Sequence, residues 1–354
     1  LEKTSSVLLA IRRLWHEEFG SDSYATEVTK ERFLALVARI GVRLSDAEHE
    51  QLWATFSERL RGAGVDYIDW TQHLALDAAT TRKFFVHRAY DLGVLRPIAQ
   101  AGVLPLLDDR HVQLLGNFTA RLNRIAAAAA AANVRLLVDA EQTYMQPCID
   151  HMVRQLQARH NRAGAPPIVY NTYQCYLRFS KQRLLNDLER AERRGYVWAA
   201  KFVRGAYMVG ERQRAHALGE PSPIFDCIEH THANYDECAR VVLERMRAGV
   251  PLGLMVATHN QRSIELTAAT MRAARITDGV YFAQLLGMMD HLTFTLANNG
   301  FAVYKYVPYG PVHEVIPYLL RRAHENSDAL SGSGRQRHLL FVELRRRLLR
   351  GGLR

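Results

Sequence analysis

The sequence predicts an α/β fold in which a parallel sheet and its covering helices follow a helical N-terminal segment. From about residue 135 onward, short apolar segments that end in polar residues alternate with helical stretches. Residues 1 to about 80 instead carry apolar side chains at helical spacing. Alternation of buried strands with helices is typical of parallel sheets joined by right-handed crossovers.

The length and composition fit one large domain and a smaller module. The chain has 354 residues, whereas a single α/β barrel takes roughly 250. Hydrophobic residues make up 48% and no apolar run approaches the roughly 20 residues of a membrane span, which indicates a soluble globular chain. The four cysteines lack the spacing of a zinc site or a disulfide scaffold, so we expect reduced packing residues at Cys148, Cys175, Cys227 and Cys238.

Neither the net charge nor the first residues of the chain identify a binding partner or a location. The net charge is +10, and the excess gathers in residues 335–354. Such a tail could meet nucleic acid or an anionic membrane surface, but the solvated face of an amphipathic terminal helix is the favoured explanation. No targeting segment is visible at residue 1, which is leucine and not methionine, so we expect a processed or trimmed chain.

The N-terminal segment is expected to be a helical module. Helical spacing of apolar residues predicts helices over residues 5–19, 30–42 and 46–60. The succession of residues 33–41, 44–56 and 65–74 resembles a paired EF-hand module. An EF-hand loop needs acidic oxygen ligands at alternating positions, but residues 57–70 read SERLRGAGVDYIDW, with arginine and glycine at those places. We therefore expect an EF-hand-like shape without calcium.

A linker, a helix and then a series of six strands are predicted after the helical module. Residues 83–109 read as a linker with extended pieces, and the alanine run at 126–132 favours a helix because alanine has the best helix propensity. Six strand candidates come next, at residues 135–142, 167–174, 197–207, 252–260, 279–287 and 301–310.

The arrangement of polar groups favours a barrel over an open sheet. An open doubly wound sheet gathers its site at one switch point, with GxGxxG at the first turn. Here no GxGxxG is present, and polar residues stand at all six strand ends. A closed (β/α)₈ barrel needs eight strands. We therefore predict a modified (β/α)₈ barrel. Its first strand or strands either lie upstream of this chain or lack a clear sequence pattern within it.

Chemistry in such folds gathers at the carboxyl ends of the strands. The last predicted helix adds a polar stripe at spacing i, i+3, i+4 and i+7, formed by Tyr318, Arg321, Arg322 and Glu325. The strand ends together supply Asp139 and Glu141; Asn171 and Gln174; Lys201, Arg204 and Tyr207; Thr258, His259 and Asn260; Gln284; and Tyr306 and Tyr309.

Several chemistries compete for these groups. Asp139, Glu141 and His259 could bind a metal on paper, but the lysine and arginines around them would repel a cation, so we expect no metal. Covalent hydrolysis is disfavoured, because no serine or cysteine stands at a strand end beside a histidine and an acid. Lys201 could form a Schiff base, as in barrel aldolases. The inventory best suits a large polar cofactor with phosphates, such as a flavin, and a small carboxylate held by two arginines.

Seven segments in order closely resemble the proline dehydrogenase family: LLVDAEQTYMQP, VYNTYQCYL, AKFVRGAYM, VATHN, FAQLLGM, VYKYVPYGP and PYLLRRAHEN. The likeness runs from about residue 80 to the C-terminus, and the first 80 residues resemble an insertion of eukaryotic members. It implies a helical module at 1–80 and an FAD-binding barrel at 81–354. It also implies oxidation of L-proline to Δ1-pyrroline-5-carboxylate by hydride transfer to FAD, with membrane quinone as the electron acceptor. The expected location is the matrix side of the inner mitochondrial membrane, with peripheral association and no nucleic-acid partner.

The resemblance also assigns roles to residues. Arg321 and Arg322 would grip the proline carboxylate, Glu325 would order them and the flavin, and Lys201 would lie near flavin N5. The substrate residues carried over are Asp139, Tyr306, Tyr318, Arg321, Arg322 and Glu325. The flavin residues carried over are Val169, Asn171, Lys201, Val203, Gly205, Tyr207, Thr258, His259, Asn260 and Gln284.

One departure and three alternatives remain. The family uses a lysine in an early KLxAL strand to contact the carboxylate, and only the context of Lys83 is remotely close, so we expect an N-terminally incomplete chain. Hydroxyproline dehydrogenase is the first alternative, although a tyrosine at 306 would crowd a 4-hydroxyl. A non-catalytic scaffold without FAD and a Lys201-dependent aldolase are the others.

Overall fold

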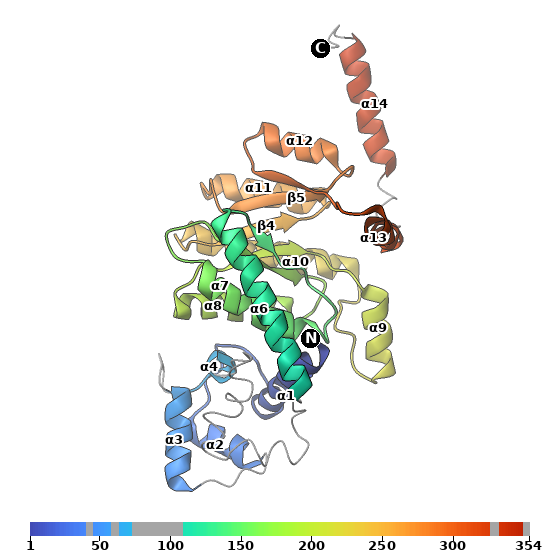
Figure 1. The fold of residues 1–354 in the computed structure, drawn as a ribbon. Helices are drawn as coiled ribbons and strands as arrows, with labels where there is room; N and C mark the ends of the chain where they lie inside the picture. Colours follow the sequence, from blue (N-terminus) through green and yellow to red (C-terminus); the bar gives the residue numbers. More distant parts are fainter. Residues whose placement is uncertain (40–44, 58–63, 73–108, 326–332, 350–354) are drawn as a thin grey trace. The chain divides into compact units, whose positions relative to one another are not determined.

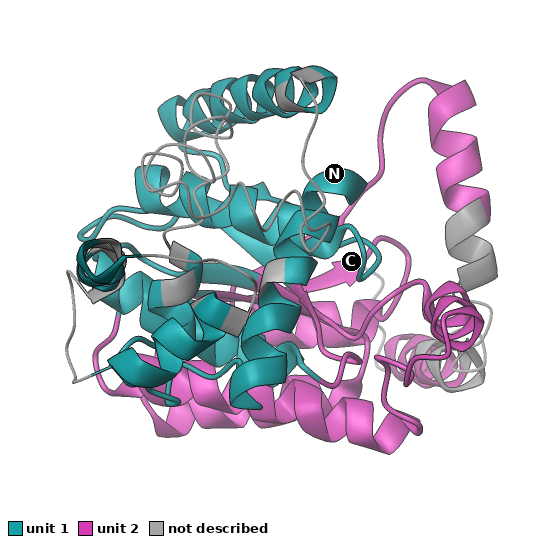
Figure 2. Cartoon of the chain, turned by 90° about the horizontal axis from the view of Figure 1, so that it is seen from below, with its two compact units in different colours: residues 1–172, 179–200, 251–253 teal, residues 173–178, 201–250, 254–354 magenta. Residues whose placement is uncertain are grey.

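The computed structural model describes residues 1–39, 45–57, 64–72, 109–325 and 333–349 (Figure 1). The chain divides into two compact units (Figure 2). Unit 1 comprises residues 1–172, 179–200 and 251–253, and unit 2 comprises residues 173–178, 201–250 and 254–354.

Unit 1 begins with four helices, which we name the helical module. They are α1 (Glu2–Phe19), α2 (Lys30–Arg39), α3 (Asp46–Ser57) and α4 (Tyr67–Gln72). The three helices predicted here are confirmed. Trp15, Phe33 and Ile68 are fully buried and form the centre of the module.

An antiparallel bridge closes the module between the segments that precede α2 and α4. Val28 and Val65 exchange two backbone hydrogen bonds, of 2.8 and 2.9 Å. A Cβ at Gly64 would lie 2.7 Å from the Val28 carbonyl oxygen, so the close approach requires glycine there. The EF-hand-like description stays a prediction. In the part of the chain that the structure describes, no group of three or more His, Cys, Asp or Glu residues could hold a metal ion.

The sheet has the order β1-β2-β3-β4-β5-β6. All six predicted strands are confirmed, with parallel pairing that joins Leu136 to Val169, Met255 to Tyr281 and Phe282 to Val303. The α/β class is therefore confirmed, and parallel order explains why every position of the second strand is buried. The strands are β1 (Leu136–Leu137), β2 (Val169–Gln174), β3 (Ala199–Val203), β4 (Gly253–Ala257), β5 (Val280–Leu285) and β6 (Val303–Tyr306).

Helices alternate with these strands. The alanine run is helical as predicted, and the predicted linker at 83–109 lies outside the described residues apart from its last residue, which begins α6. No helix in the described ranges is both long and apolar enough to cross a membrane. The helices are α6 (Asp109–Ala131), α7 (Gln146–His160), α8 (Ser180–Arg194), α9 (Met208–Ala217), α10 (Ile228–Arg247), α11 (Gln261–Ala273), α12 (Asp290–Asn298), α13 (Val312–Glu325) and α14 (Ser333–Leu349).

A buried asparagine at the end of α7 sets the start of β2. The Asn161 side chain accepts hydrogen bonds from the backbone N–H groups of Ile168 and Val169, at 3.0 and 2.8 Å. Its amide donates to the carbonyls of Val169 and Val197, at 2.8 and 3.0 Å. All four bonding positions are thus used, as burial of an amide requires. The four cysteines form no disulfide, as predicted.

Candidate active site

In unit 1, a buried carboxylate organises the end of β2. Asp150 of α7 is only 5% exposed. Its Oδ1 accepts from Asn171 Nδ2 at 3.0 Å and from Gln146 Nε2 at 2.7 Å, and its Oδ2 pairs with Arg183 Nη1 of α8 at 3.3 Å. A buried carboxylate is stable only when it is paired and hydrogen-bonded, and here it is both. We name Gln146, Asp150, Asn171 and Arg183 the Asp150 network.

The backbone on either side of Asp139 is fixed to the same region. The Val138 carbonyl accepts from Thr172 Oγ1 at 2.7 Å. The Glu141 N–H donates to Gln146 Oε1 at 2.9 Å. Asp139 itself is exposed and lies two residues after the end of β1. In unit 1, buried polar side chains therefore hold in place the ends of β1 and β2, which carry Asp139 and Asn171.

In unit 2, Gly205 follows β3 in a backbone conformation that excludes other residues. Its φ is +146°, and a Cβ there would lie 2.4 Å from Cδ1 of Tyr176. The Tyr176 hydroxyl donates to the Ala206 carbonyl and so holds the ring in place. Gly205, which the resemblance assigns to the flavin site, is therefore required by the Tyr176 ring.

Arg204 is turned toward helices α10 and α11. Its Nε donates to His232 Nδ1 at 2.9 Å, and its Nη2 donates to Ser263 Oγ at 2.9 Å. Its Nη1 donates to Thr258 Oγ1, and its guanidinium carbon stands 4.5 Å from the ring centroid of Tyr235. Arg204 is one of the strand-end residues that, as a set, predicted a cofactor with phosphates. In unit 2 this arginine instead fixes the end of β4, because each of its nitrogens already has a partner.

The residues after β4 form a rigid turn. Asn260 caps α11, since its Oδ1 accepts from the Ser263 N–H at 3.0 Å, and its own N–H donates to Thr258 Oγ1 at 3.1 Å. The Nε2 of His259 accepts from the Leu285 N–H at 3.1 Å, which requires a neutral ring with its proton on Nδ1. Burial, and then the charge of Lys305, lower the pKa of His259 and favour that neutral form.

The side-chain amide of Gln284 has a buried donor that a ligand could satisfy. The side chain is 2% exposed, and its Oε1 accepts from Thr293 Oγ1 at 2.9 Å. Its Nε2 has no hydrogen-bond partner among the residues that the structure describes. A buried donor left without a partner costs about 1–3 kcal/mol. An acceptor supplied by a bound molecule would remove that cost, which is the fit expected of a polar cofactor.

At the end of β6, two tyrosines face each other. The ring centroids of Tyr306 and Tyr318 are 6.3 Å apart and the rings are inclined at 42°. Tyr306 is 43% exposed, so the pair lies at an accessible surface of unit 2. The side chains of Arg321, Arg322 and Glu325 lie outside the described part of the chain, although the backbone of all three belongs to α13.

Other predicted site residues occupy the expected strand ends. Val169 is buried in β2, and Lys201 and Val203 lie in β3. Tyr207 precedes α9 with a left-handed backbone, φ +67°. The residues that the sequence missed are Asp150, Arg183 and His232. They lie on helices, where no strand-end signal marks them, and only the folded contacts reveal them.

Comparison with known proteins shows which protein family this chain is similar to. A profile of the family described as "Proline dehydrogenase" matches residues 30–335. A human protein named "Proline dehydrogenase 1, mitochondrial" is 39% identical over 364 residues, which cover 99% of this chain and 58% of that protein. A bovine "Hydroxyproline dehydrogenase" is 43% identical over 259 residues, covering 72% of this chain and 56% of the relative. The chain thus spans a little more than half the length of these relatives.

A solved structure is similar as well. The crystal structure of proline utilization A from Bdellovibrio bacteriovorus, inactivated by N-propargylglycine, superposes with a TM-score of 0.54 at 25% identity. The match covers 59% of this chain and 21% of that one.

Proposed function

The chain belongs to the proline dehydrogenase family, and from this premise we propose that it oxidises L-proline to Δ1-pyrroline-5-carboxylate with FAD as the acceptor. The observation that carries the proposal furthest is the buried Gln284 amide, whose Nε2 lacks a partner among the described residues. The pyrimidine edge of a flavin offers carbonyl and ring-nitrogen acceptors of the kind this donor needs.

The residues present suit FAD. Asn260 and Thr258 form a fixed polar turn at the start of α11, and the N-terminus of a helix favours phosphate oxygens. Lys201 would place a cation near the flavin ring. When bound, FAD would supply the acceptor for a hydride from C5 of proline. The residues proposed to hold it are Val169, Asn171, Lys201, Val203, Gly205, Tyr207, Thr258, His259, Asn260 and Gln284.

The substrate is proposed to bind beside the tyrosine pair. Tyr306 and Tyr318 would wall the pyrrolidine ring, and Arg321 and Arg322 would clamp the carboxylate by charge-assisted hydrogen bonds. Such a clamp orients C5, and correct orientation can lower a barrier by several kcal/mol. The proline nitrogen must be neutral when C5 loses hydride. Asp139 would contact the substrate, and Glu325 would order the arginines.

Hydroxyproline is the second candidate substrate, because the bovine relative named for it is 43% identical over 72% of this chain. The two substrates differ by one hydroxyl on C4 of the ring. Tyr306 would crowd that hydroxyl, so we favour proline. Steady-state rates on both substrates decide between them, and faster turnover of hydroxyproline would reverse the assignment.

Location and electron acceptor are part of the proposal. Relatives from human and cattle are named mitochondrial, and we place this chain in the mitochondrion, at the matrix side of the inner membrane, with membrane quinone as the electron acceptor. The terminal helix α14 offers a membrane contact, since it exposes Phe341, Leu344 and Leu348 beside Arg345 and Arg347. Sedimentation with anionic liposomes, with and without residues 335–354, tests that contact.

One experiment tests the function as a whole. The chain is expressed with riboflavin, purified, and assayed for bound FAD and for proline-dependent reduction of a soluble quinone analogue. We expect a yellow protein that reduces the quinone with L-proline and not with D-proline. A colourless protein that takes up no added FAD would instead support the non-catalytic scaffold, and borohydride trapping of a carbonyl compound on Lys201 would support an aldolase.

A further inference from the structure

The helical module is attached to unit 1 by buried polar contacts at two places. The first is the start of α7, whose capping residue Met145 offers no side-chain hydrogen bond. Ser5 of α1, which is fully buried, replaces that cap from a distance in the sequence. Its Oγ accepts from the Cys148 N–H at 3.0 Å and donates to the Met145 carbonyl at 2.8 Å. The module therefore satisfies backbone groups that α7 leaves open.

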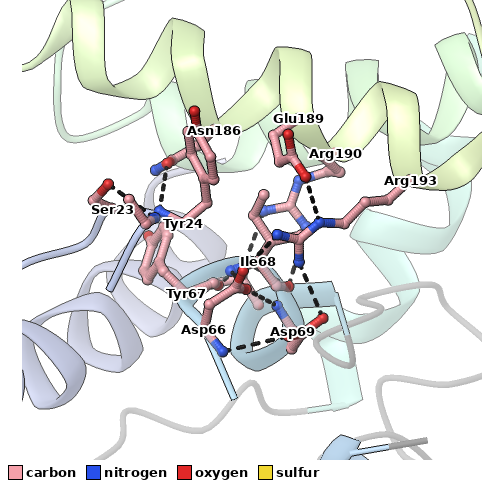
Figure 3. Close-up of polar contacts among 12 residues, drawn as sticks. Ser23, Tyr24, Asp66, Tyr67, Ile68, Asp69, Asn186, Glu189, Arg190 and Arg193 are labelled. Atoms are coloured by element: carbon pink, nitrogen blue, oxygen red, sulfur yellow. Dashed lines mark hydrogen bonds and ion pairs between the residues drawn. The ribbon is translucent and has the colours of Figure 1, made fainter. Parts of the chain in front are cut away.

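The second attachment is a paired acid at the start of α4. Asp66 Oδ1 accepts from the N–H groups of Ile68 and Asp69 at 2.8 and 2.9 Å, and Asp69 Oδ2 accepts from the Asp66 N–H at 3.3 Å. This is a reciprocal cap of the helix start. Both carboxylates also face one guanidinium, because Arg193 of α8 donates to Asp66 Oδ2 at 2.6 Å and to Asp69 Oδ1 at 3.4 Å (Figure 3).

Helix α8 holds the module along one face. Arg190 Nη2 donates to Thr71 Oγ1 at 2.7 Å, and Asn186 Nδ2 donates to the Asp22 carbonyl at 2.7 Å. Asn186 Oδ1 also accepts from the Tyr24 N–H at 3.1 Å (Figure 3). Asn186, Arg190 and Arg193 have the spacing of a single helix face.

The same face of α8 reaches the candidate site. Arg183, three residues before Asn186, pairs with Asp150 at 3.3 Å and donates to the Thr172 carbonyl at 2.9 Å. At the other attachment, Ser5 caps α7 next to Gln146, and Asp150 lies one turn further along that helix. The two helices that the module contacts are thus the two that supply Gln146, Asp150 and Arg183 of the Asp150 network.

We propose that the helical module is a brace for the cofactor site: by capping α7 through Ser5 and gripping α8 through Arg190 and Arg193, it positions the Asp150 network and hence Asn171 and Asp139. The proposal rests on the proposed function, in that the positioned residues are taken to serve FAD. Arg193 and Ser5 are positioning residues, since neither belongs to the residues proposed to hold the cofactor or the substrate. A side chain of α8 that lacks these contacts, such as the exposed Arg194, should not matter.

The test measures the dissociation constant for FAD of the full chain by fluorescence titration, at a temperature where circular dichroism shows every variant folded. Arg193→Met removes the grip. Asp66→Asn removes the charge but keeps an oxygen that caps α4, so it isolates the ion pair from helix capping. Arg194→Met is the matched control. We expect both module variants to weaken FAD binding roughly threefold to thirtyfold, the range for coupling through a packed network, and the control to match the parent chain.

A double-mutant cycle separates positioning from general loosening. Asp150→Asn should weaken FAD binding by itself. If the module acts through the Asp150 network, Arg193→Met adds little in the Asp150→Asn background, whereas independent loosening would add in full. Full additivity, or FAD binding by Arg193→Met equal to that of the parent chain, overturns the proposal.

Hydrogen exchange decides the case in which the parent chain binds no FAD. That result would remove the proposed function but not the brace. The backbone amides of Cys148 and Thr172 should then exchange faster in Arg193→Met than in Arg194→Met. Equal exchange of these amides in the two variants would overturn the brace.

Discussion

The ring of Tyr318 lies 6.3 Å from the ring of Tyr306, inclined at 42°, and this contact joins α13 to the end of β6. Arg321 and Arg322 follow Tyr318 by three and four residues, the spacing that places helix residues on one face. The tyrosine pair therefore orients the helix whose next turn carries both arginines. On this basis the substrate carboxylate is expected one helical turn beyond the ring.

The arginine pair gives the first prediction. Arg321→Met or Arg322→Met should raise KM for L-proline by roughly tenfold to a hundredfold, because a lost charge-assisted contact costs about 1.5–3 kcal/mol. FAD content should survive, since the arginines are assigned to the substrate. Arg345→Met on the exposed α14 is the control. An unchanged KM in both variants would return the pair to the solvent-exposed surface of the helix.

The substrate preference gives the second prediction. Tyr306→Ser should raise kcat/KM for 4-hydroxyproline relative to proline, because a small residue leaves room for the 4-hydroxyl. The ratio of the two kcat/KM values, measured in one preparation, checks this. If Tyr306→Ser lowers both values in equal proportion, the tyrosine does not select between the substrates.

The third prediction concerns the buried amide of Gln284. Gln284→Met keeps the side-chain length but removes the donor, so FAD binding should weaken roughly fivefold, the effect of about 1 kcal/mol for one hydrogen bond. The thermal stability of the FAD-free chain should change little, because the loss of the Thr293 hydrogen bond to Oε1 is offset by the removal of a buried donor that has no partner there. Thr293→Val, which alters only the Oε1 side of the amide, is the control. Equal FAD affinity in Gln284→Met and the parent chain would mean that Nε2 does not meet the cofactor.

The fourth prediction is a pH dependence in the helical module. Burial, and then the charge of Asp66, raise the pKa of Asp69 from 3.8 to about 6. A carboxyl with a raised pKa stabilises the folded state fully below pH 3.8, and that contribution is lost as the pH rises through about 6. The groups facing it are Asp66, immediately before α4, and Arg193 of α8, which also pairs with Glu189.

The measurement compares melting temperatures of the parent chain and Asp69→Asn between pH 4.5 and 7.5. Relative to Asp69→Asn, the parent should lose stability as the pH rises across this window. Glu17→Gln, at an exposed position of α1, should show no such trend. A parent chain that gains on Asp69→Asn with rising pH would show that Arg193 outweighs burial at this site.

The sequence predicted the strands better than the contacts of their end residues. Strand ends are marked by a local change from apolar to polar residues, so residues such as Asn171 and His259 could be assigned to strand ends in advance. Asp150 gave no such signal, because a carboxylate on a helix is usually solvated and only the fold brings Asn171 and Arg183 to it. Arg204 was visible in the sequence, but its three partners come from α10, α11 and the end of β4, far apart in the chain.

In the helical module, too, the helices could be predicted from the sequence but their long-range contacts could not. Apolar spacing was enough to predict α1, α2 and α3. It could not show that Ser5 caps α7, 143 residues away in the sequence, since one hydroxyl carries no periodic pattern. Long-range polar contacts of this kind depend on the packing of whole elements.

The most direct test of the central claim is anaerobic addition of L-proline to the FAD-loaded chain while the visible absorption of the flavin is recorded. Proline oxidation predicts that this absorption bleaches with L-proline, stays unchanged with D-proline, and returns when a soluble quinone is added. Flavin absorption that persists in excess L-proline, in protein shown to be folded and FAD-loaded, would contradict the account.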